Sequence, residues 1–382
     1  MRSPNIAYVP GIDHLRAYAA TLIVFYHGLQ LFSQQRIYGG FDSSRWMHAS
    51  NPFSALVIEG HTAVALFMTL SGFIFASASL KKAVRYGPFI RNRALRIFPL
   101  FIAVLGVGVY AKGVYLTGRP VDFGGIAASV FLLSNTTAAF GAPPFTDLLW
   151  TIAVEFQFYL LFPFLITFVQ REGPSILFKI IGFLLLMRIA AMLAGANSRD
   201  LPYWTLVGRM DQFCLGMWFA WAYTERRHWF RHPGLQLLAA AAAVLLLLFL
   251  FNVLGGGWPT IAPWKLGFHT VEGAAWGYLI VCYLLVSPRM PEAMSKVLCY
   301  VGSISYSMYL LHWIVVNLMM RNKLLLRIAP DPYVDAIANT VLVAFPVTLL
   351  VSTLSYQAVE LPFLNLRGSY LVEQTGATRR AA

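Results

Sequence analysis

The sequence predicts an all-α protein that crosses a membrane many times, and its composition carries that prediction. Hydrophobic residues make up 58% of the 382 residues and charged residues only 12%. The mean hydropathy is +0.64. A soluble domain has about a quarter of its residues charged, so this chain has too few charges to cover a water-facing surface. Much of its surface must therefore face lipid.

Runs of about twenty apolar residues are long enough to cross a bilayer as helices. The stretch 124–135 is too short, and we expect it to be re-entrant or interfacial. Arg16 interrupts the first run and no small-residue cleavage site follows, which favours an uncleaved span over a signal peptide. Ten runs qualify: 14–32, 60–80, 98–116, 148–169, 176–194, 206–223, 234–254, 267–286, 298–320 and 334–358.

The distribution of Lys and Arg favours cytoplasmic termini. Ten spans place both termini on one side, and a cytoplasmic assignment puts seventeen of the 29 basic residues inside, nine outside and three within spans. This ratio agrees with the enrichment of basic residues in cytoplasmic loops, although the cluster Arg321–Arg327 opposes it. Basic residues between apolar runs indicate an anionic membrane surface rather than nucleic acid. The three cysteines have no paired spacing that would indicate a disulfide or a thiol site.

Several ionisable residues lie in or beside the predicted spans, where a charge at the helix centre costs about 2.5–3.5 kcal/mol. We expect Arg209 to pair with Asp211, which follows it closely. Glu59, His61 and Glu272 are expected near helix ends, where water is available. The others need a polar interior lined by protein, and they are Arg16, His27, Glu155, Arg188, His269 and His312.

Arg16 and His27 are predicted to share one face of the first span. Eleven residues turn a helix by about 1100°, or three turns plus about 20°, and separate the two along the axis by about 16 Å. They therefore mark two depths on one wall, with the arginine near the cytoplasmic surface. This arrangement suits a long ligand whose anionic or polar part lies by Arg16 and whose reactive end lies by His27. Either residue alone would more simply be paired with a neighbour.

Two further stretches carry polar residues near the predicted cytoplasmic side. Arg93 and Arg96 are three residues apart just before the third span, so one helical turn would point both the same way. An arginine fork in front of a helix N-terminus is a good receptor for phosphate groups, while the simpler interpretation is a positive-inside loop. Ser71 and Gly72 lie in the second span, where the glycine allows a close helix approach or a kink.

The fourth and ninth spans carry buried polar groups. Glu155 lies one to two turns inside the fourth span, where a lone carboxylate is protonated, pairs with an arginine or orients a histidine. Ser305, Tyr309 and His312 form a polar stripe on the ninth span, which fits a core hydrogen-bond network or a site equally well. The histidines are scattered, and no spacing indicates a metal site.

In order along the chain, these segments resemble the membrane-bound acyltransferase 3 family, whose members acylate cell-surface and secreted carbohydrates. His14 stands where the family usually has glycine, and Phe156 where it usually has a second acid. The resemblance covers most of residues 12–364. It rests on DHLR with His27, FMTLSGFIF, RALRI, LWTIAVEFQFYLLFP, SYSMYLLH and VELPF.

The resemblance implies transfer of an acyl group, commonly acetyl, from cytoplasmic acyl-CoA to a carbohydrate hydroxyl. His27 would be the general base, Arg16 would position the donor or stabilise the thioester oxyanion, and Arg93 and Arg96 would bind the phosphates of CoA. An acyl-histidine relay and direct transfer both remain open. Ser71 is placed with the donor-binding residues, and the supporting catalytic candidates are Glu155 and His312.

Acyl-CoA is thus expected as a donor substrate, with no permanently bound cofactor or metal. The expected partners are a carbohydrate or glycolipid acceptor and membrane lipid, with no nucleic acid. A single domain over 1–366 in the bacterial inner membrane would be followed by a short cytoplasmic tail at 367–382, expected to be disordered. The alternatives are a proton-coupled transporter, which also needs intramembrane His, Glu and Arg, and a non-catalytic receptor or scaffold.

Overall fold

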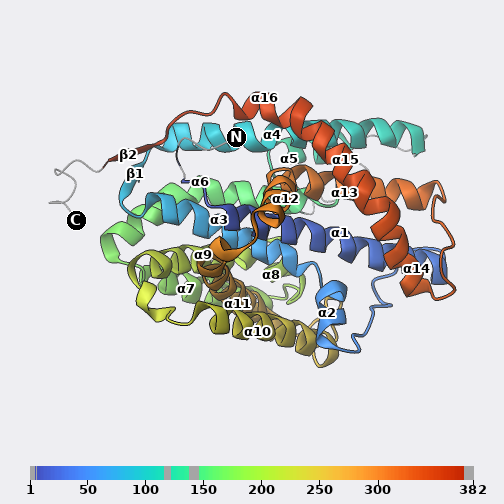
Figure 1. The fold of residues 1–382 in the computed structure, drawn as a ribbon, viewed down its shortest axis with the longest axis horizontal. Coiled ribbons are helices and arrows are strands. Elements are labelled where there is room, and N and C mark those ends of the chain that lie inside the picture. Colours follow the sequence, from blue (N-terminus) through green and yellow to red (C-terminus); the bar gives the residue numbers. More distant parts are fainter. Residues whose placement is uncertain (1–4, 6, 116–121, 137–145, 374–382) are drawn as a thin grey trace.

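A computed structural model describes residues 5, 7–115, 122–136 and 146–373 as a helical bundle with a two-stranded sheet at one end (Figure 1). Its elements are α1 (Pro10–Tyr38), α2 (Pro52–Ile58), α3 (Thr62–Ser79), β1 (Lys82–Val84), α4 (Tyr86–Tyr115), α5 (Phe123–Val130), α6 (Leu149–Glu172), α7 (Ile176–Leu193), α8 (Asp200–Trp204), α9 (Leu206–Glu225), η1 (Arg227–Trp229), α10 (Pro233–Val253), α11 (Lys265–Val286), η2 (Ser287–Arg289), α12 (Glu292–Ser303), α13 (Ser305–Arg321), α14 (Pro332–Asn339), η3 (Thr340–Ala344), α15 (Phe345–Ser355), η4 (Tyr356–Glu360), α16 (Leu361–Leu364) and β2 (Leu371–Glu373).

The helices confirm an all-α polytopic membrane protein. Among the described residues, seven helical segments are long and apolar enough to cross a membrane, or eight if α12 and α13 form one broken span. These two helices meet at a 65° bend, so the run 298–320 is not the single straight helix that the sequence predicts. Two other expected spans are α1 and α9, with 29 and 20 residues, which have lengths of about 43 and 30 Å. The count of ten spans stays a prediction.

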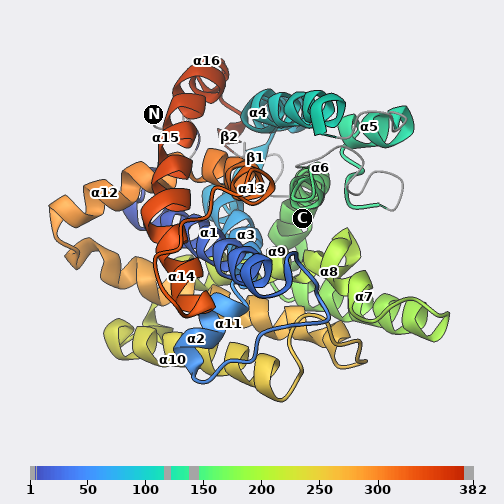
Figure 2. The ribbon, with the colours of Figure 1, turned by 90° about the vertical axis from the view of Figure 1, so that its right-hand side faces the viewer.

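Helix α1 is the central element of the bundle. It contacts α3, α11, α12, α13 and α14, which surround it in the view along its axis (Figure 2). Seventeen of its 29 residues are buried, whereas α7 and α10 bury only 17% and 22% of their most apolar windows and face outward. Pro10 begins α1 with its fixed φ, and Gly39 ends it in the left-handed region at φ 76°. Side chains on α1 therefore point into protein rather than into lipid.

Helices α3 and α9 approach closely through a glycine on each. A Cβ atom on Gly72 would lie 2.1 Å from the carbonyl oxygen of Phe213, and one on Gly216 would lie 2.0 Å from that of Thr69. Small residues allow such close backbone contact between membrane helices. The expectation of a close approach at Gly72 is confirmed.

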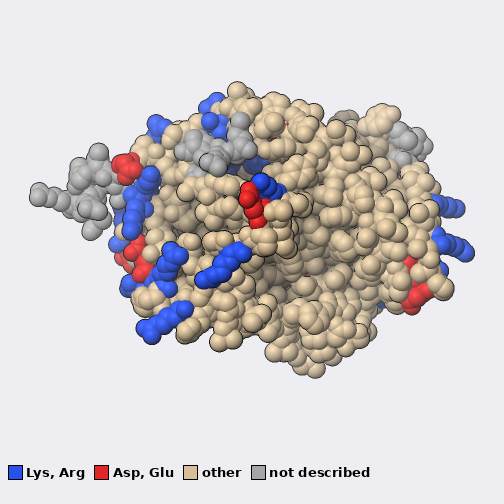
Figure 3. All heavy atoms as spheres, in the orientation of Figure 1, with Lys and Arg blue, Asp and Glu red and all other residues tan. Residues whose placement is uncertain are grey.

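The described residues nearest the two termini lie at the same end of the bundle. Strand β2 pairs antiparallel with β1, and the side-chain amide of Asn5 donates to the carbonyl of Gly368 at 3.0 Å. The expected tail from residue 367 therefore begins with an ordered segment in which Tyr370 is fully buried, while residues 374–382 lie outside the described part. Figure 3 shows Lys and Arg gathered at this end of the molecule and a smaller group at the opposite end.

Candidate functional site

His27 on α1 and His312 on α13 form a hydrogen-bonded pair. His27 Nδ1 and His312 Nε2 are 2.9 Å apart, and the rings stack with their centroids at 5.1 Å. The Nδ1 of His312 lies 2.9 Å from the carbonyl oxygen of Met308, which can only accept a hydrogen bond. A neutral His312 therefore holds its proton on Nδ1 and accepts at Nε2, so His27 donates from its own Nδ1. This chain of contacts leaves the lone pair of His27 on Nε2.

The other polar members of α13 also lie in the interior. Ser305 and Tyr309 line a cavity within the bundle, and Thr151 Oγ1 donates to the Tyr309 hydroxyl at 2.9 Å. Trp313 packs edge-on against His27 with ring centroids at 4.8 Å. The polar stripe predicted for this helix is thus partly a core network, through Tyr309, and partly the histidine pair.

A cavity at the end of the bundle that holds the termini is rich in arginine. It has an empty volume of about 1380 Å³, and its lining includes one acidic residue, Asp13, beside four arginines: Arg16, Arg93, Arg96 and Arg367. We call it the mouth. Burial, followed by the guanidinium groups of Arg93 and Arg96, lowers the pKa of Arg367 to about 10, so Arg367 remains charged at neutral pH. The mouth therefore carries an excess of positive charge.

The four arginines differ in how far carboxylates neutralise them. Arg16 lies 3.0 Å from Asp13, and Arg96 lies 2.8 Å from the buried Glu360. Arg93 is 8% exposed and makes no ion pair within the described residues, and its Nε has no hydrogen-bond partner there. Its guanidinium instead lies over the ring of Phe75 at 4.8 Å. A buried, unpaired cation is costly, so Arg93 is the arginine best placed to gain from an anionic ligand.

The prediction that Arg93 and Arg96 lie in front of a helix N-terminus is wrong. Helix α4 begins at Tyr86 and runs through Pro99, so both arginines lie inside it. The expected span began at residue 98, where the apolar run starts. Helix α4 begins twelve residues earlier, so its first turns are polar and carry both arginines. Their positive charge, rather than a helix dipole, is what a ligand would meet.

Glu155 on α6 lies in an inner cavity next to the mouth. Its Oε1 accepts from the Ser71 hydroxyl at 2.9 Å and from the hydroxyl of Tyr159 one helical turn later. This cavity has an empty volume of about 860 Å³ and shares Arg16, Arg93 and Arg96 with the mouth. Ser71 and Glu155 are thus brought together, but neither contacts the histidine pair.

A third cavity lies on the other side of the inner one and contains His27. It has an empty volume of about 880 Å³, and its lining shares Val64 and Tyr309 with the inner cavity. We call it the outer cavity. The mouth, the inner cavity and the outer cavity thus adjoin in series along α1, with Arg16 on the walls of the first two and His27 on the wall of the third. The two residues face adjoining interior spaces, as their helical spacing predicts.

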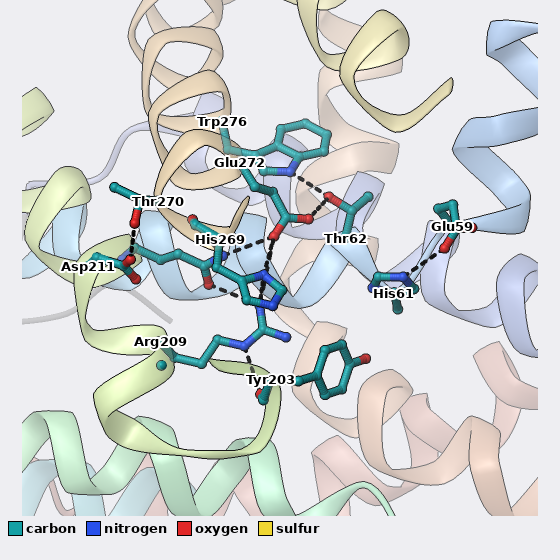
Figure 4. Close-up of polar contacts among 12 residues, drawn as sticks. Glu59, His61, Thr62, Tyr203, Arg209, Asp211, His269, Thr270, Glu272 and Trp276 are labelled. Atoms are coloured by element: carbon teal, nitrogen blue, oxygen red, sulfur yellow. Dashed lines mark hydrogen bonds and ion pairs between the residues drawn. The ribbon is translucent and has the colours of Figure 1, made fainter. Parts of the chain in front are cut away.

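A second buried polar network connects α3, α9 and α11. The ion pair that the sequence predicts within it, between Arg209 and Asp211, is wrong. Asp211 pairs with Arg188 at 2.9 Å and accepts from Thr270, while Arg209 contacts His269 at 3.1 Å. The expected Arg209–Asp211 pair is therefore absent, since residues two apart in a helix point to different sides. Figure 4 shows Thr62, His269 and Arg209 converging on Glu272.

The sequence predicts that water reaches Glu59, His61 and Glu272, and this prediction is wrong. All three are buried, with 0%, 4% and 1% of their surface exposed. Glu59 accepts hydrogen bonds from the indole of Trp46 at 2.8 Å and from Asn252 at 2.6 Å. These contacts satisfy the carboxylate inside the protein, which is how buried charges persist.

The two residues that depart from the family motifs are both accommodated by contacts with neighbouring side chains. They are His14, whose ring nitrogens contact Tyr283 and Ser295, and Phe156, which packs on Phe98.

The fold and the site together define a multi-pass membrane protein whose interior holds a series of adjoining cavities from a cationic mouth to the wall that carries His27. Residues 9–357 match the family model described as an acyltransferase domain, and the chain belongs to this acyltransferase 3 family. It is similar to O-acetyltransferase OatA of Staphylococcus aureus strain NCTC 8325 / PS 47 and to that of strain COL. Each is 24% identical over 390 residues, covering 95% of this chain. The chain spans 58% of the length of these relatives. No solved structure matches it.

Proposed function

We propose that this protein is an O-acyltransferase that takes an acyl group, specifically acetyl, from acyl-CoA at the mouth and transfers it to a carbohydrate hydroxyl beside His27. The observation that carries the proposal is the series of three adjoining cavities from Arg16 to His27. The family supplies the reaction class, and the relatives' printed names specify O-acetyl transfer.

The donor fits the mouth and the inner cavity by charge and by length. The phosphates of CoA are polyanionic, and four arginines with a single acid line the mouth. Guanidinium groups bind phosphate through charge-assisted hydrogen bonds. The axial separation of Arg16 and His27, about 16 Å, is comparable to an extended pantetheine arm. Ser71, held by Glu155, would lie along the path of that arm.

The transfer step follows from the protonation state of the histidine pair. His27 Nε2 would remove the proton of the acceptor hydroxyl while the oxygen attacks the thioester carbonyl. As the C–S bond breaks, the proton passes from His27 to the departing thiolate of CoA. General base catalysis of this kind contributes about 10²–10⁴-fold. His312 positions His27 through its Nε2, and Arg16 would hold the donor.

Radiolabelled acetyl-CoA and a soluble glycoside, supplied to the full chain in nanodiscs, test the proposal. His27→Ala should reduce transfer by about 10²–10⁴-fold. The control is His228→Ala, because His228 lies in the short helix η1 and lines none of the three cavities. Full activity of His27→Ala at equal folded yield would remove His27 from the mechanism. Label trapped on the protein without acceptor would favour an acyl-histidine relay over direct transfer.

We also propose ten spans with both termini in the cytoplasm of a bacterial inner membrane. The paired β1 and β2 strands and the contact between Asn5 and Gly368 support a common side for the two termini. Reporter fusions test the side: a fusion after Ala382 should be active only as a cytoplasmic reporter. A fusion after Lys323 should be active only as a reporter on the far side, and the reverse pattern would invert the topology.

A further inference from the structure

The three cysteines of the chain lie in different surroundings. Cys214 on α9 and Cys282 on α11 are fully buried, and they line none of the three cavities. Cys299 on α12 is partly exposed and lines the mouth. A thiol reacts with a small molecule only where that molecule can reach it. Cys299 is therefore the thiol that a molecule entering the mouth would meet.

Polar groups from two other positions on the mouth side contact the Cys299 sulfur. The sulfur lies 3.9 Å from the carbonyl oxygen of Pro10 and 4.0 Å from the Ser295 hydroxyl. A hydrogen bond with Cys299, followed by burial, raises the pKa of Tyr8, so the Tyr8 hydroxyl keeps its proton at neutral pH. This hydroxyl can donate a hydrogen bond to the sulfur, and such a donor stabilises the thiolate, which is the nucleophilic form.

Two arginines on the same lining have no carboxylate partner among the described residues. They are Arg93 and Arg367, whereas the one acid of the mouth, Asp13, is paired with Arg16 at 3.0 Å. Arg93 is more than nine-tenths buried, and its Nε has no hydrogen-bond partner within the described part of the chain. A buried cation without a counter-ion favours an anionic ligand. The mouth thus attracts anions to the space that Cys299 faces.

From these features we infer that Cys299 is a modification site for anionic disulfides of low molecular weight. The Cys299 sulfur attacks one sulfur of the disulfide, and the new S–S bond forms as the old one breaks. The released thiolate takes up the proton that Cys299 gives off, so no further oxidant is needed. The group left on Cys299 is anionic and pairs with Arg93 and Arg367. Glutathione disulfide and CoA disulfide both have this chemistry.

The modification closes the mouth to the donor. The group on Cys299 occupies the same space of about 1380 Å³ whose arginines are proposed to bind the phosphates of CoA. This consequence rests on the proposed function, whereas the reaction at Cys299 does not. Because a thiol reductant cleaves the mixed disulfide, the closure is reversible. Oxidising conditions would therefore block the mouth, and reducing conditions would reopen it.

The test uses the full chain in nanodiscs and measures the mass of the intact protein after treatment with one disulfide. The three reagents are glutathione disulfide, CoA disulfide and cystamine, which is cationic. We expect one adduct, mapped to Cys299 by peptide mass spectrometry. After normalisation to the rate of each reagent with a free thiol in solution, the anionic disulfides should react at least about tenfold faster than cystamine. This preference should shrink as salt is added.

Reaction of both anionic disulfides would assign the preference to negative charge alone. Reaction of CoA disulfide without glutathione disulfide would add recognition of the nucleotide part. Arg367→Gln should weaken the preference over cystamine, because it removes one charge from the mouth. Arg289→Gln, which removes an exposed charge outside the mouth lining, is the matched control and should keep it. No adduct at Cys299, or equal normalised rates for anionic and cationic disulfides, would overturn the modification site.

Acetyl transfer then separates this inference from the proposed function. Transfer from acetyl-CoA should fall in proportion to the fraction of protein modified and return after dithiothreitol. The activity of Cys299→Ser should be the same before and after treatment. A charge-selective adduct at Cys299 in a protein that does not use acetyl-CoA would support the modification site and refute the donor. An adduct that leaves acetyl transfer unchanged would overturn the closure of the mouth.

Discussion

Replacing His312 is the sharpest probe of the histidine pair. The Met308 carbonyl fixes the His312 proton on Nδ1, and His312 Nε2 in turn accepts from His27. In His312→Leu, the His27 Nδ1–H loses the acceptor that His312 supplies, which costs about 1–3 kcal/mol. If the whole penalty falls on the reactive tautomer, transfer slows by about fivefold to 150-fold, at 1.36 kcal/mol per factor of ten. His312→Gln, which keeps a side-chain oxygen as acceptor, should retain more activity than His312→Leu.

The assay is single-turnover acetyl transfer in nanodiscs at saturating donor and acceptor, so that the chemical step is observed. In a His27→Ala background, His312→Leu should cause little further loss, because groups that act as a unit are not additive. Equal folded yield and unchanged donor affinity are the controls for a structural effect. Full activity of His312→Leu, or losses that multiply in the double variant, would refute the argument that His312 acts through His27.

Three further outcomes follow from other contacts. Arg93→Ala should raise the KM for acetyl-CoA by about tenfold to a hundredfold, since a hydrogen bond to a charged group contributes about 1.5–3 kcal/mol; an unchanged KM at low salt would place the phosphates elsewhere. Gly72→Val should lower the thermal unfolding midpoint, because its Cβ would meet the Phe213 carbonyl, while Gly182→Ala, with open space around it, should not. Arg188→Met should destabilise by about 3–5 kcal/mol by leaving Asp211 as an unpaired buried charge. Adding Asp211→Leu should restore most of that stability, measured by thermal unfolding in the same detergent.

Much of the candidate site could be predicted from local spacing. Arg16 and His27 lie on one helix, so the helical repeat alone sets their common face and their separation in depth. The same is true of Ser305, Tyr309 and His312 on α13. The contact between His27 and His312 could not be predicted in this way, since 285 residues separate them and only the packing of α13 on α1 brings them together.

The pairing of buried charges was the least predictable feature. Arg209 and Asp211 are close in sequence, yet Asp211 pairs with Arg188 on α7 and Arg209 turns toward His269 on α11. Glu360 gave no signal of its own in the closing motif, but it neutralises Arg96 from η4. Arg367 lay in the expected tail and instead lines the mouth. In each of the three pairs the partner comes from a distant helix, and its position depends on how the helices cross.

The sequence by itself determined the membrane environment, the helical class and the family, because composition, apolar run length and ordered motifs are properties of the chain alone. Only the tertiary structure decided that Arg93 and Arg367 of the mouth are left without a carboxylate among the described residues, which nitrogen of His27 carries the lone pair, and that tryptophans from five separate segments meet in one cavity. The physical reason is that hydrogen bonds and ion pairs act over a few ångströms, whereas the residues that form them are brought within that range only by the packing of whole helices.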